Sequence, residues 1–273
     1  MPRNNFQALQ YARAQLGRPY WFGTFGQIAN ERLFKEKKKQ FPKYYTAKDF
    51  PSQYGQKVHD CGGLAYKGYM MSAGPDEPAK YIEKYDVSVD RMINMCQERG
   101  EIKTMPDIPG IFVWKKGHGG IYEGNGIVIE AKGHSYGVIR TKNTDWKMWG
   151  KIPWWEYITL NSWVSSLYRY ILDREPDALG FEFWLKKIRT RELTPGEIVR
   201  GFLLSEEFTN RNVSDSAFLV ILYQVFFNRE PDASGYSFWM AQIPIVGRSS
   251  VVGGFIASTE WSLMEQYLDY INK

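Results

Sequence analysis

The sequence contains few residues of the kinds that build disulfide frameworks or metal centres. Among its 273 residues are two cysteines and three histidines. Cys61 and Cys96 cannot form a framework of several disulfides, and neither has a His or Cys partner at the spacing of zinc ligands. We therefore expect no disulfide framework, no metal and no other cofactor.

Long apolar runs are also missing. No stretch of about 20 apolar residues is present, so we expect no membrane-spanning helix. The N-terminal segment MPRNNFQALQYARAQL lacks the apolar core of a secretory signal. We therefore expect synthesis in a reducing cytosol, with any action outside the cell depending on another route of release.

The excess of positive charge is small, at +5. It favours approach to a polyanion, either nucleic acid or an anionic cell wall. The strongest basic run, KEKKKQ (35–40), has no glycine or aromatic residue between its charges and is typical of a solvated helix face. No other segment resembles a nucleic-acid-binding motif, so we expect no nucleic-acid partner.

Aromatic residues are abundant, at 16% of the chain, with 10 Trp and 18 Tyr. Such residues either fill cores or present faces that stack on sugars and extended peptides. Composition alone leaves both interpretations open.

An internal repeat sets the domain boundary. LYRYILDREPDALGFEFWLKKI (167–188) and LYQVFFNREPDASGYSFWMAQI (222–243) share 11 of 22 positions, and GEIVRGFLLSEEF (196–208) corresponds to SSVVGGFIASTEW (249–261). Each copy predicts a helix, a turn, a short aromatic helix and a further helix. We therefore expect residues 161–273 to form an all-α tandem-repeat domain, with copies at about 162–212 and 213–273.

The turn of each repeat follows a helix that Pro176 or Pro231 ends, and we expect Gly180 and Gly235 to take positive φ angles there. Acidic and amide residues at 173, 177, 228 and 232 allow a calcium loop, although their spacing is not that of an EF-hand. We favour instead a buried arginine–aspartate pair that fixes each turn, Arg174 with Asp177 and Arg229 with Asp232.

Residues 1–160 predict an α+β domain with helices first and an antiparallel sheet later. NNFQALQYARAQLG (4–17) has the apolar period of a helix that closes at Gly17, whereas residues 23–58 show no clear period. Residues 108–142 are rich in strand-forming residues, with EGNG as a hairpin turn. PWWEYITLNS (153–162) is expected to supply a closing strand and the linker.

The stretch HDCGGL (59–64) places Cys61 where a helix is expected to begin. Asp60 can cap that helix, and a helix N-terminus lowers the pKa of a thiol and so activates it as a nucleophile. The alternative is a small buried residue at a helix start. A nucleophile also requires a base, which must come from the three histidines.

His118 is the best candidate base, because it lies on a strand that enters a tight glycine-rich hairpin. His59 adjoins the cysteine, but adjacent side chains in a turn point apart. Across the hairpin, Glu130 is an even number of residues from His118 and can share its face of the sheet, where it would orient the imidazole. His134, beyond the break at Gly133, is the alternative third member.

Three motifs in order resemble the NlpC family of papain-like cysteine peptidases, which cleave peptidoglycan stem peptides. They are LGRPYWFG (16–23), DCGGL (60–64) and GHGGIYEGNG (117–126), followed by a polar residue on the next strand. The resemblance covers roughly residues 5–160. It implies an NlpC-type catalytic domain, at 1–160, with helices packed on an antiparallel sheet.

The resemblance also implies the roles of individual residues. Cys61 would be the nucleophile, His118 the base and Glu130 the orienting residue, with no metal; many members of the family have His, Asn or Gln at the third place. Tyr20 matches a tyrosine that lies near the nucleophile and helps the oxyanion hole, or it is a packed core residue. The long insert at 23–58 resembles phage endolysins, and it would line a substrate cleft or cover the fold.

The expected function is therefore that of a peptidoglycan hydrolase of the endolysin type, made in the host cytoplasm and acting at the bacterial cell wall after release. Cleavage between D-glutamate and the diamino acid is favoured over amidase cleavage between muramic acid and L-alanine. A bacterial autolysin or remodelling enzyme, and a non-catalytic wall-binding protein, are the alternatives.

The repeats resemble an uncharacterised family of tandem tail modules found in secreted and surface-associated bacterial proteins. We expect residues 161–273 to bind the wall, through glycan or a polyanionic wall polymer. Trp184 and Trp239 are the candidate stacking residues. The alternative is that these two side chains belong to the core of each repeat.

Overall fold

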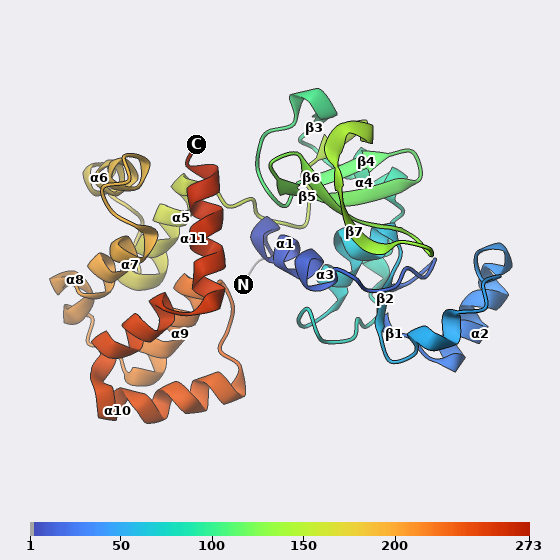
Figure 1. The fold of residues 1–273 in the computed structure, drawn as a ribbon. Coiled ribbons are helices and arrows are strands. Elements are labelled where there is room, and N and C mark those ends of the chain that lie inside the picture. Colours follow the sequence, from blue (N-terminus) through green and yellow to red (C-terminus); the bar gives the residue numbers. More distant parts are fainter. Residues whose placement is uncertain (1–2) are drawn as a thin grey trace. The chain divides into compact units, whose positions relative to one another are not determined.

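The computed structural model describes residues 3–273 and is drawn in Figure 1. The chain divides into two units, one ending at Tyr157 and the other beginning at Ile158. The first unit combines helices with antiparallel sheet, and the second is helical throughout. The mixed class predicted for the first part and the helical class predicted for the second are confirmed.

Six strands form the main sheet of the first unit, in the order β3-β8-β4-β5-β6-β7, and every neighbouring pair is antiparallel. A separate two-stranded sheet joins β1 to β2. The strands are β1 (Phe25–Ile28), β2 (Lys57–His59), β3 (Arg99–Glu101), β4 (Phe112–Lys115), β5 (His118–Gly124), β6 (Ile127–Gly133), β7 (Gly137–Lys142) and β8 (Met148–Gly150).

The helices of this unit are short, and most of them precede the sheet. They are α1 (Asn5–Ala14), α2 (Glu31–Gln40), a π-helical turn (Gly63–Lys67) that runs into α3 (Gly68–Met71), and α4 (Val89–Met95). Single 3-10 turns occur at Pro42–Tyr44, Phe50–Gln53, Glu83–Tyr85, Ile102–Thr104 and Asn143–Asp145.

Two local predictions are confirmed and a third is wrong. The helix predicted over residues 4–17 is α1, capped by Asn4 and followed by Gly17 at φ 79°. The predicted hairpin turn joins β5 to β6, with Asn125 and Gly126 at positive φ. Residues 153–162 form no closing strand: only Glu156 makes an isolated bridge, to Asn4, before the next helix begins.

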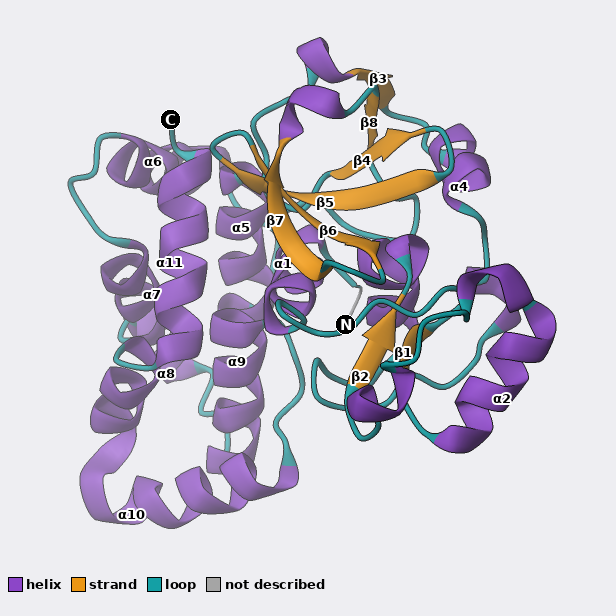
Figure 2. Ribbon diagram, turned by 45° about the vertical axis from the view of Figure 1, so that its right-hand side comes forward, coloured by secondary structure: helices purple, strands orange, loops and turns teal. Residues whose placement is uncertain are grey.

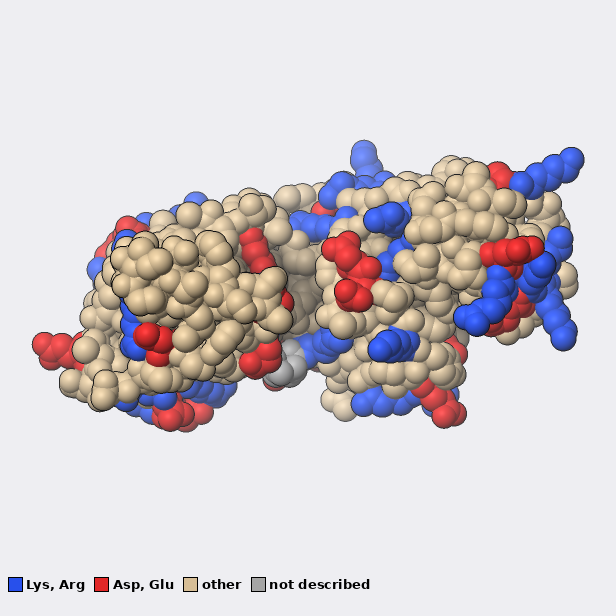
Figure 3. Space-filling model, turned by 90° about the horizontal axis from the view of Figure 1, so that it is seen from below, with Lys and Arg blue, Asp and Glu red and all other residues tan. Residues whose placement is uncertain are grey.

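The segment 23–58 is ordered by aromatic packing. Trp21, Tyr45 and Phe50 are almost fully buried with Leu33 and Val58, and the Trp21 ring meets Phe50 edge to face at 5.3 Å. Figure 2 shows α2 beside β1 and β2, away from the six-stranded sheet. The basic run 35–40 lies in α2 and its charged side chains are mostly exposed, as predicted. At this end of the molecule Figure 3 shows both signs of charge intermixed.

The main sheet is covered differently on its two faces. Ile121, Ile129 and Ala131 point toward the helices α1, α3 and α4 and form the largest core of the unit. The alternate positions, Val128 and Tyr122, pack with Trp146 on the opposite face. This alternation fixes the side of the sheet on which each hairpin residue lies.

The second unit contains two similar helical repeats. Its helices are α5 (Leu160–Leu167), which continues as a π-helical turn (Tyr168–Leu172), α6 (Ala178–Arg189), α7 (Pro195–Leu203), α8 (Glu206–Asn210), α9 (Asp215–Phe227), α10 (Ala233–Ile256, broken at Gly247) and α11 (Thr259–Ile271). Within residues 3–273 no single helix is long and apolar enough to cross a membrane; α10 and α11 meet that length and composition only as a bent pair.

The glycine prediction for the repeat turns is wrong. The left-handed conformation falls on Asp173 (φ 57°) and Asn228 (φ 50°). Gly180 and Gly235 lie instead in the first turns of α6 and α10, and a Cβ on Gly235 would come within 2.1 Å of the Tyr223 hydroxyl. Close packing on a tyrosine, rather than backbone strain, therefore accounts for glycine at these positions.

The predicted arginine–aspartate pairs are present, but they are part of a larger, half-exposed cluster. Arg174 lies 3.3 Å from Asp177 and also forms a two-pronged pair with Glu207. The second repeat reproduces the same set, with Arg229, Asp232 and Glu260. Within residues 3–273 no group of three or more His, Cys, Asp or Glu side chains is arranged to hold a metal ion.

Candidate active site

A helix begins at Cys61, as predicted, and Asp60 caps it. The Asp60 carboxylate accepts the N–H of Gly63 through Oδ1 at 2.6 Å, and Leu64 donates its N–H to the Asp60 carbonyl at 2.9 Å. Oδ2 accepts the N–H of Gly23 at 3.1 Å. One partly buried carboxylate therefore joins the helix start to the loop that precedes β1.

The two glycines after Cys61 differ in how closely other atoms approach them. A Cβ on Gly63 would lie 2.1 Å from the Thr24 carbonyl oxygen and 2.8 Å from the Phe25 Cα, both of which are backbone atoms. The corresponding distances at Gly62 are all at least 3.3 Å. Gly63 thus allows the helix to pack directly on the backbone of β1, which fixes the depth at which Cys61 lies.

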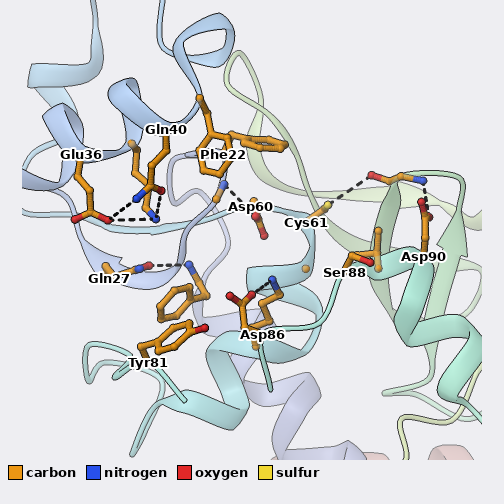
Figure 4. Close-up of a pocket in the computed structure, with 18 residues that line it drawn as sticks. Phe22, Gln27, Glu36, Gln40, Asp60, Cys61, Tyr81, Asp86, Ser88 and Asp90 are labelled. Carbon is orange, nitrogen blue, oxygen red and sulfur yellow. Dashed lines mark hydrogen bonds and ion pairs between the residues drawn. The ribbon is translucent and has the colours of Figure 1, made fainter. Parts of the chain in front are cut away.

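The Cys61 thiol lies against the backbone at the start of β5. Its Sγ is 3.9 Å from the Gly117 carbonyl oxygen, to which Figure 4 draws the contact. A hydrogen bond from the N–H of Gly119 lowers the pKa of the thiol. These peptide groups flank His118. The Cys61 thiol therefore lies against the backbone on both sides of His118.

The pKa of the Cys61 thiol is raised, whereas a helix N-terminus was expected to lower it. Burial and, to a smaller extent, the charge of Asp60 raise the pKa of the thiol, the N–H groups of Gly119, Gly62 and Cys61 itself partly offset this, and the resulting pKa is about 12. The lowering of the pKa expected from a helix N-terminus is thus outweighed. At neutral pH the thiol is protonated until a base accepts its proton.

His118 and Glu130 are in contact. His118 Nε2 lies 2.5 Å from Glu130 Oε2, and Thr141 donates its hydroxyl to Oε1 at 2.6 Å. Burial raises the pKa of Glu130, but the hydrogen bonds from His118 and Thr141 lower it below the usual value. The ionised carboxylate fixes the imidazole and leaves Nδ1 as the ring nitrogen available to a second partner.

The hairpin register explains this contact. Ile121 pairs with Ile129, so His118 and Glu130 both project from the sheet face that carries Trp146. The His118 ring stacks on Trp146 with centroids 5.4 Å apart. Cys61 packs with the helices on the other face, and its Sγ contacts the carbonyl of Gly117, the residue just before β5.

The other two histidines have different partners. His59 is fully buried and bonded through Nε2 to the Tyr11 hydroxyl at 2.8 Å, and burial lowers its pKa to about 3. His134 Nε2 lies 2.7 Å from Asp49 Oδ1 of the insert. His134 is therefore placed with the insert, and Glu130 rather than His134 contacts the His118 imidazole.

Tyr20 lies near Cys61. It is half-buried, forms an isolated bridge with His59 and packs against the main core. Burial raises its pKa, and the charges of Asp60 and Cys61 raise it further. Its hydroxyl therefore stays protonated and can donate a hydrogen bond.

Cys96, the other cysteine, is buried in the core and donates its S–H to the Met92 carbonyl.

Cys61 opens into a cleft of 730 Å³ whose walls come from distant segments. One wall consists of α2 with Phe41, and the other is the segment 81–90 (Figure 4). The sequence suggested that the insert either lined a cleft or covered the fold, and it does line one. The individual wall residues were missed: Glu36, Lys37, Gln40, Tyr81, Asp86, Ser88 and Asp90.

Asp90 is the missed residue that acts most directly on the site. Its Oδ1 accepts both the indole N–H of Trp114 and the backbone N–H of Gly117, each at 2.8 Å. The carbonyl of Gly117 in turn faces the thiol. Asp90 lies in the first turn of α4, and no motif in the sequence distinguishes it.

The candidate wall-binding tryptophans are partly buried, and each packs against residues of its own repeat. The Trp184 ring lies 5.0 Å from Phe202 and against Gly201, and Trp239 lies 5.2 Å from Phe255 and against Gly254. The aromatic residues just before them, Phe183 and Phe238, are 50% and 56% exposed. The tryptophans therefore pack within their repeats while part of each side chain stays exposed.

Comparison with known proteins matches only the helical unit. The family described as "Domain of unknown function (DUF4214)" matches residues 156–212 and again residues 199–264. The two matched segments correspond broadly to the two helical repeats. No curated protein matches the chain.

Proposed function

We propose that the protein is a peptidoglycan hydrolase whose first unit is an NlpC-type, papain-like cysteine peptidase. The observation that carries the proposal is the position of Cys61. It lies at a capped helix N-terminus in a cleft, against the peptide groups that flank His118, and the His118 ring is held by a buried carboxylate. Nucleophile, base and orienting group then occupy the three roles of a thiol mechanism.

The chemistry proceeds by proton transfer and covalent catalysis. Nδ1 of His118 accepts the thiol proton, and the Cys61 sulfur attacks the carbonyl carbon of an amide bond. Backbone N–H groups at the helix start stabilise the oxyanion, with Tyr20 as a further donor. The C–N bond breaks as His118 protonates the leaving amine, and water activated by the same imidazole then hydrolyses the thioester.

The raised thiol pKa is compatible with this mechanism. A buried thiol whose pKa is near 12 is a poor nucleophile alone, so catalysis depends on transfer of its proton to His118. Glu130 supports the imidazolium that forms.

The bond proposed for cleavage is that between D-glutamate and the diamino acid of the stem peptide, and the amidase bond between muramic acid and L-alanine is the alternative. Purified peptidoglycan digested with the protein and analysed by mass spectrometry separates the two by the new termini. Cys61→Ala is expected to abolish product, and Cys96→Ala is the matched control. Unchanged lysis by Cys61→Ala would refute the enzyme and favour a non-catalytic wall-binding protein.

The helical unit is proposed as the wall-targeting part, with action at the bacterial cell wall after release, as in a phage endolysin or a bacterial autolysin. Exposed aromatic residues support this, and they shift the candidate contact from the tryptophans to Phe183 and Phe238. Sedimentation of full-length Cys61→Ala protein with purified walls provides the test. Adding Phe183→Ala and Phe238→Ala should lower the bound fraction, and equal sedimentation contradicts this contact.

A further inference from the structure

The α2 wall of the cleft carries a lysine where the helix pattern favours an apolar residue. Leu33, Phe34 and Phe41 mark the packed side of α2, and Lys37 occupies the intervening position on that side. The other three lysines of the helix are exposed, whereas Lys37 is 8% exposed. A long cationic side chain in this position costs free energy unless it has a partner.

The neighbours of Lys37 satisfy its charge only in part. An ammonium group has three N–H donors. One donates to Gln40 Oε1 at 3.2 Å, and the nearest carboxylate oxygen, from Glu36, is 3.6 Å away on a half-exposed side chain. Figure 4 shows Gln40 bridging to Glu36 along the rim of the cleft. The ammonium therefore retains capacity for a closer anionic partner.

The other lysine that lines the cleft is already engaged. Lys67 donates to Asp86 Oδ1 at 2.6 Å, so its charge is neutralised in place. Lys37 and Cys61 line the same cavity. A ligand held at the thiol that extends toward α2 therefore meets a buried, incompletely paired cation on the opposite wall.

We propose that Lys37 binds a carboxylate of the peptide ligand that extends along the cleft from Cys61. The ligand class rests on the proposed function, because stem peptides carry free carboxylates close to the scissile amide. The insert containing α2 is then a specificity element, and it selects the carboxylate form of the peptide over the form in which that group is a carboxamide.

Binding rather than turnover gives the cleanest test. Full-length Cys61→Ala protein is titrated calorimetrically with two synthetic stem peptides that differ only by carboxylate or carboxamide at one position. Lys37→Met, which keeps the length of the side chain and suits an apolar helix face, should weaken binding of the carboxylate peptide by about 10- to 100-fold, the usual size of a charged hydrogen bond. Binding of the carboxamide peptide should change by less than about twofold.

Two further variants complete the test. Lys37→Arg should retain most of the preference for the carboxylate peptide, and Lys39→Met, which removes an exposed charge from the same helix, should leave both affinities unchanged. Equal losses for the two peptides, or no loss for either, would overturn the assignment of Lys37. If neither peptide binds Cys61→Ala protein, the assignment of Lys37 also fails. If the unmodified protein does not cleave peptidoglycan, the proposed function is refuted instead.

Discussion

At the scale of single residues, Glu130 shows how one buried carboxylate serves both the site and stability. Its side chain is almost inaccessible, yet His118 and Thr141 supply a hydrogen bond to each oxygen. Removing either donor would leave part of a buried charge unsatisfied. The same contacts that orient the imidazole therefore keep Glu130 ionised.

We expect Glu130→Gln to lower kcat/KM for peptidoglycan cleavage by about 100- to 10,000-fold, because an amide cannot stabilise the imidazolium. Its effect on folding should depend on pH. The pKa of Glu130 is below the usual 4.5, so its stabilising contribution is present above that pH and is lost as the pH falls below it. Urea denaturation of both proteins at several pH values measures this.

Glu123→Gln is the matched control for that variant. Glu123 lies on the same hairpin, pairs with Arg13 and Arg140, and also has a lowered pKa. It is expected to change stability with the same sign of pH dependence while leaving kcat/KM intact. A loss of activity as large as that of Glu130→Gln would show that the hairpin, not the His118 contact, is what matters.

At the scale of elements, the helix that begins at Cys61 is held by close backbone contact. Gly63 and Gly68 both face β1, and a Cβ on Gly68 would lie 2.3 Å from the Tyr11 hydroxyl and 2.9 Å from the Phe25 carbonyl oxygen. Glycine at these positions lets the helix approach the strand more closely than any side chain would allow. The position of Cys61 in the cleft follows from this packing.

Gly63→Ala is therefore expected to lower the free energy of unfolding by about 3 kcal/mol or more, since backbone atoms of Thr24 and Phe25 cannot move aside cheaply. Gly74→Ala is the control, because nothing lies within 4 Å of its Cβ position and its φ is ordinary. Thermal and urea unfolding of the two variants give the comparison. A Gly63→Ala protein as stable as the control would contradict this packing.

The sequence predicted elements best where a local rule decides them. The α1 helix and the β5–β6 hairpin follow from apolar period and turn chemistry, and the His118–Glu130 contact follows from strand alternation across that hairpin. For α2 the sequence predicted only the solvated face of the basic run; its packed side was missed because Lys37 interrupts the apolar pattern and its packing partners are distant aromatics such as Trp21 and Phe50. The role of Asp90 was missed for the same reason, since its contacts lie 24 and 27 residues away.

At the scale of the whole molecule, each unit has its own buried core. Ile121 and Ile129 belong to the core of the first unit, whereas Leu222, Phe226 and Trp261 are fully buried in the helical unit. A stability defect in one core should therefore be largely confined to that unit. Activity on a small substrate and attachment to the wall should then be separable properties.

Phe226→Ala tests this separation. Phe226 is fully buried, with its ring 4.8 Å from Trp261 and 5.5 Å from Phe255, and truncation of a buried phenylalanine costs about 3–5 kcal/mol. Hydrogen exchange followed by mass spectrometry should show faster exchange in residues 158–273 and unchanged protection in residues 3–157. Cleavage of a soluble stem peptide should persist, while sedimentation with walls falls. Lost protection around Cys61 would mean instead that the first unit depends on the helical unit for its fold.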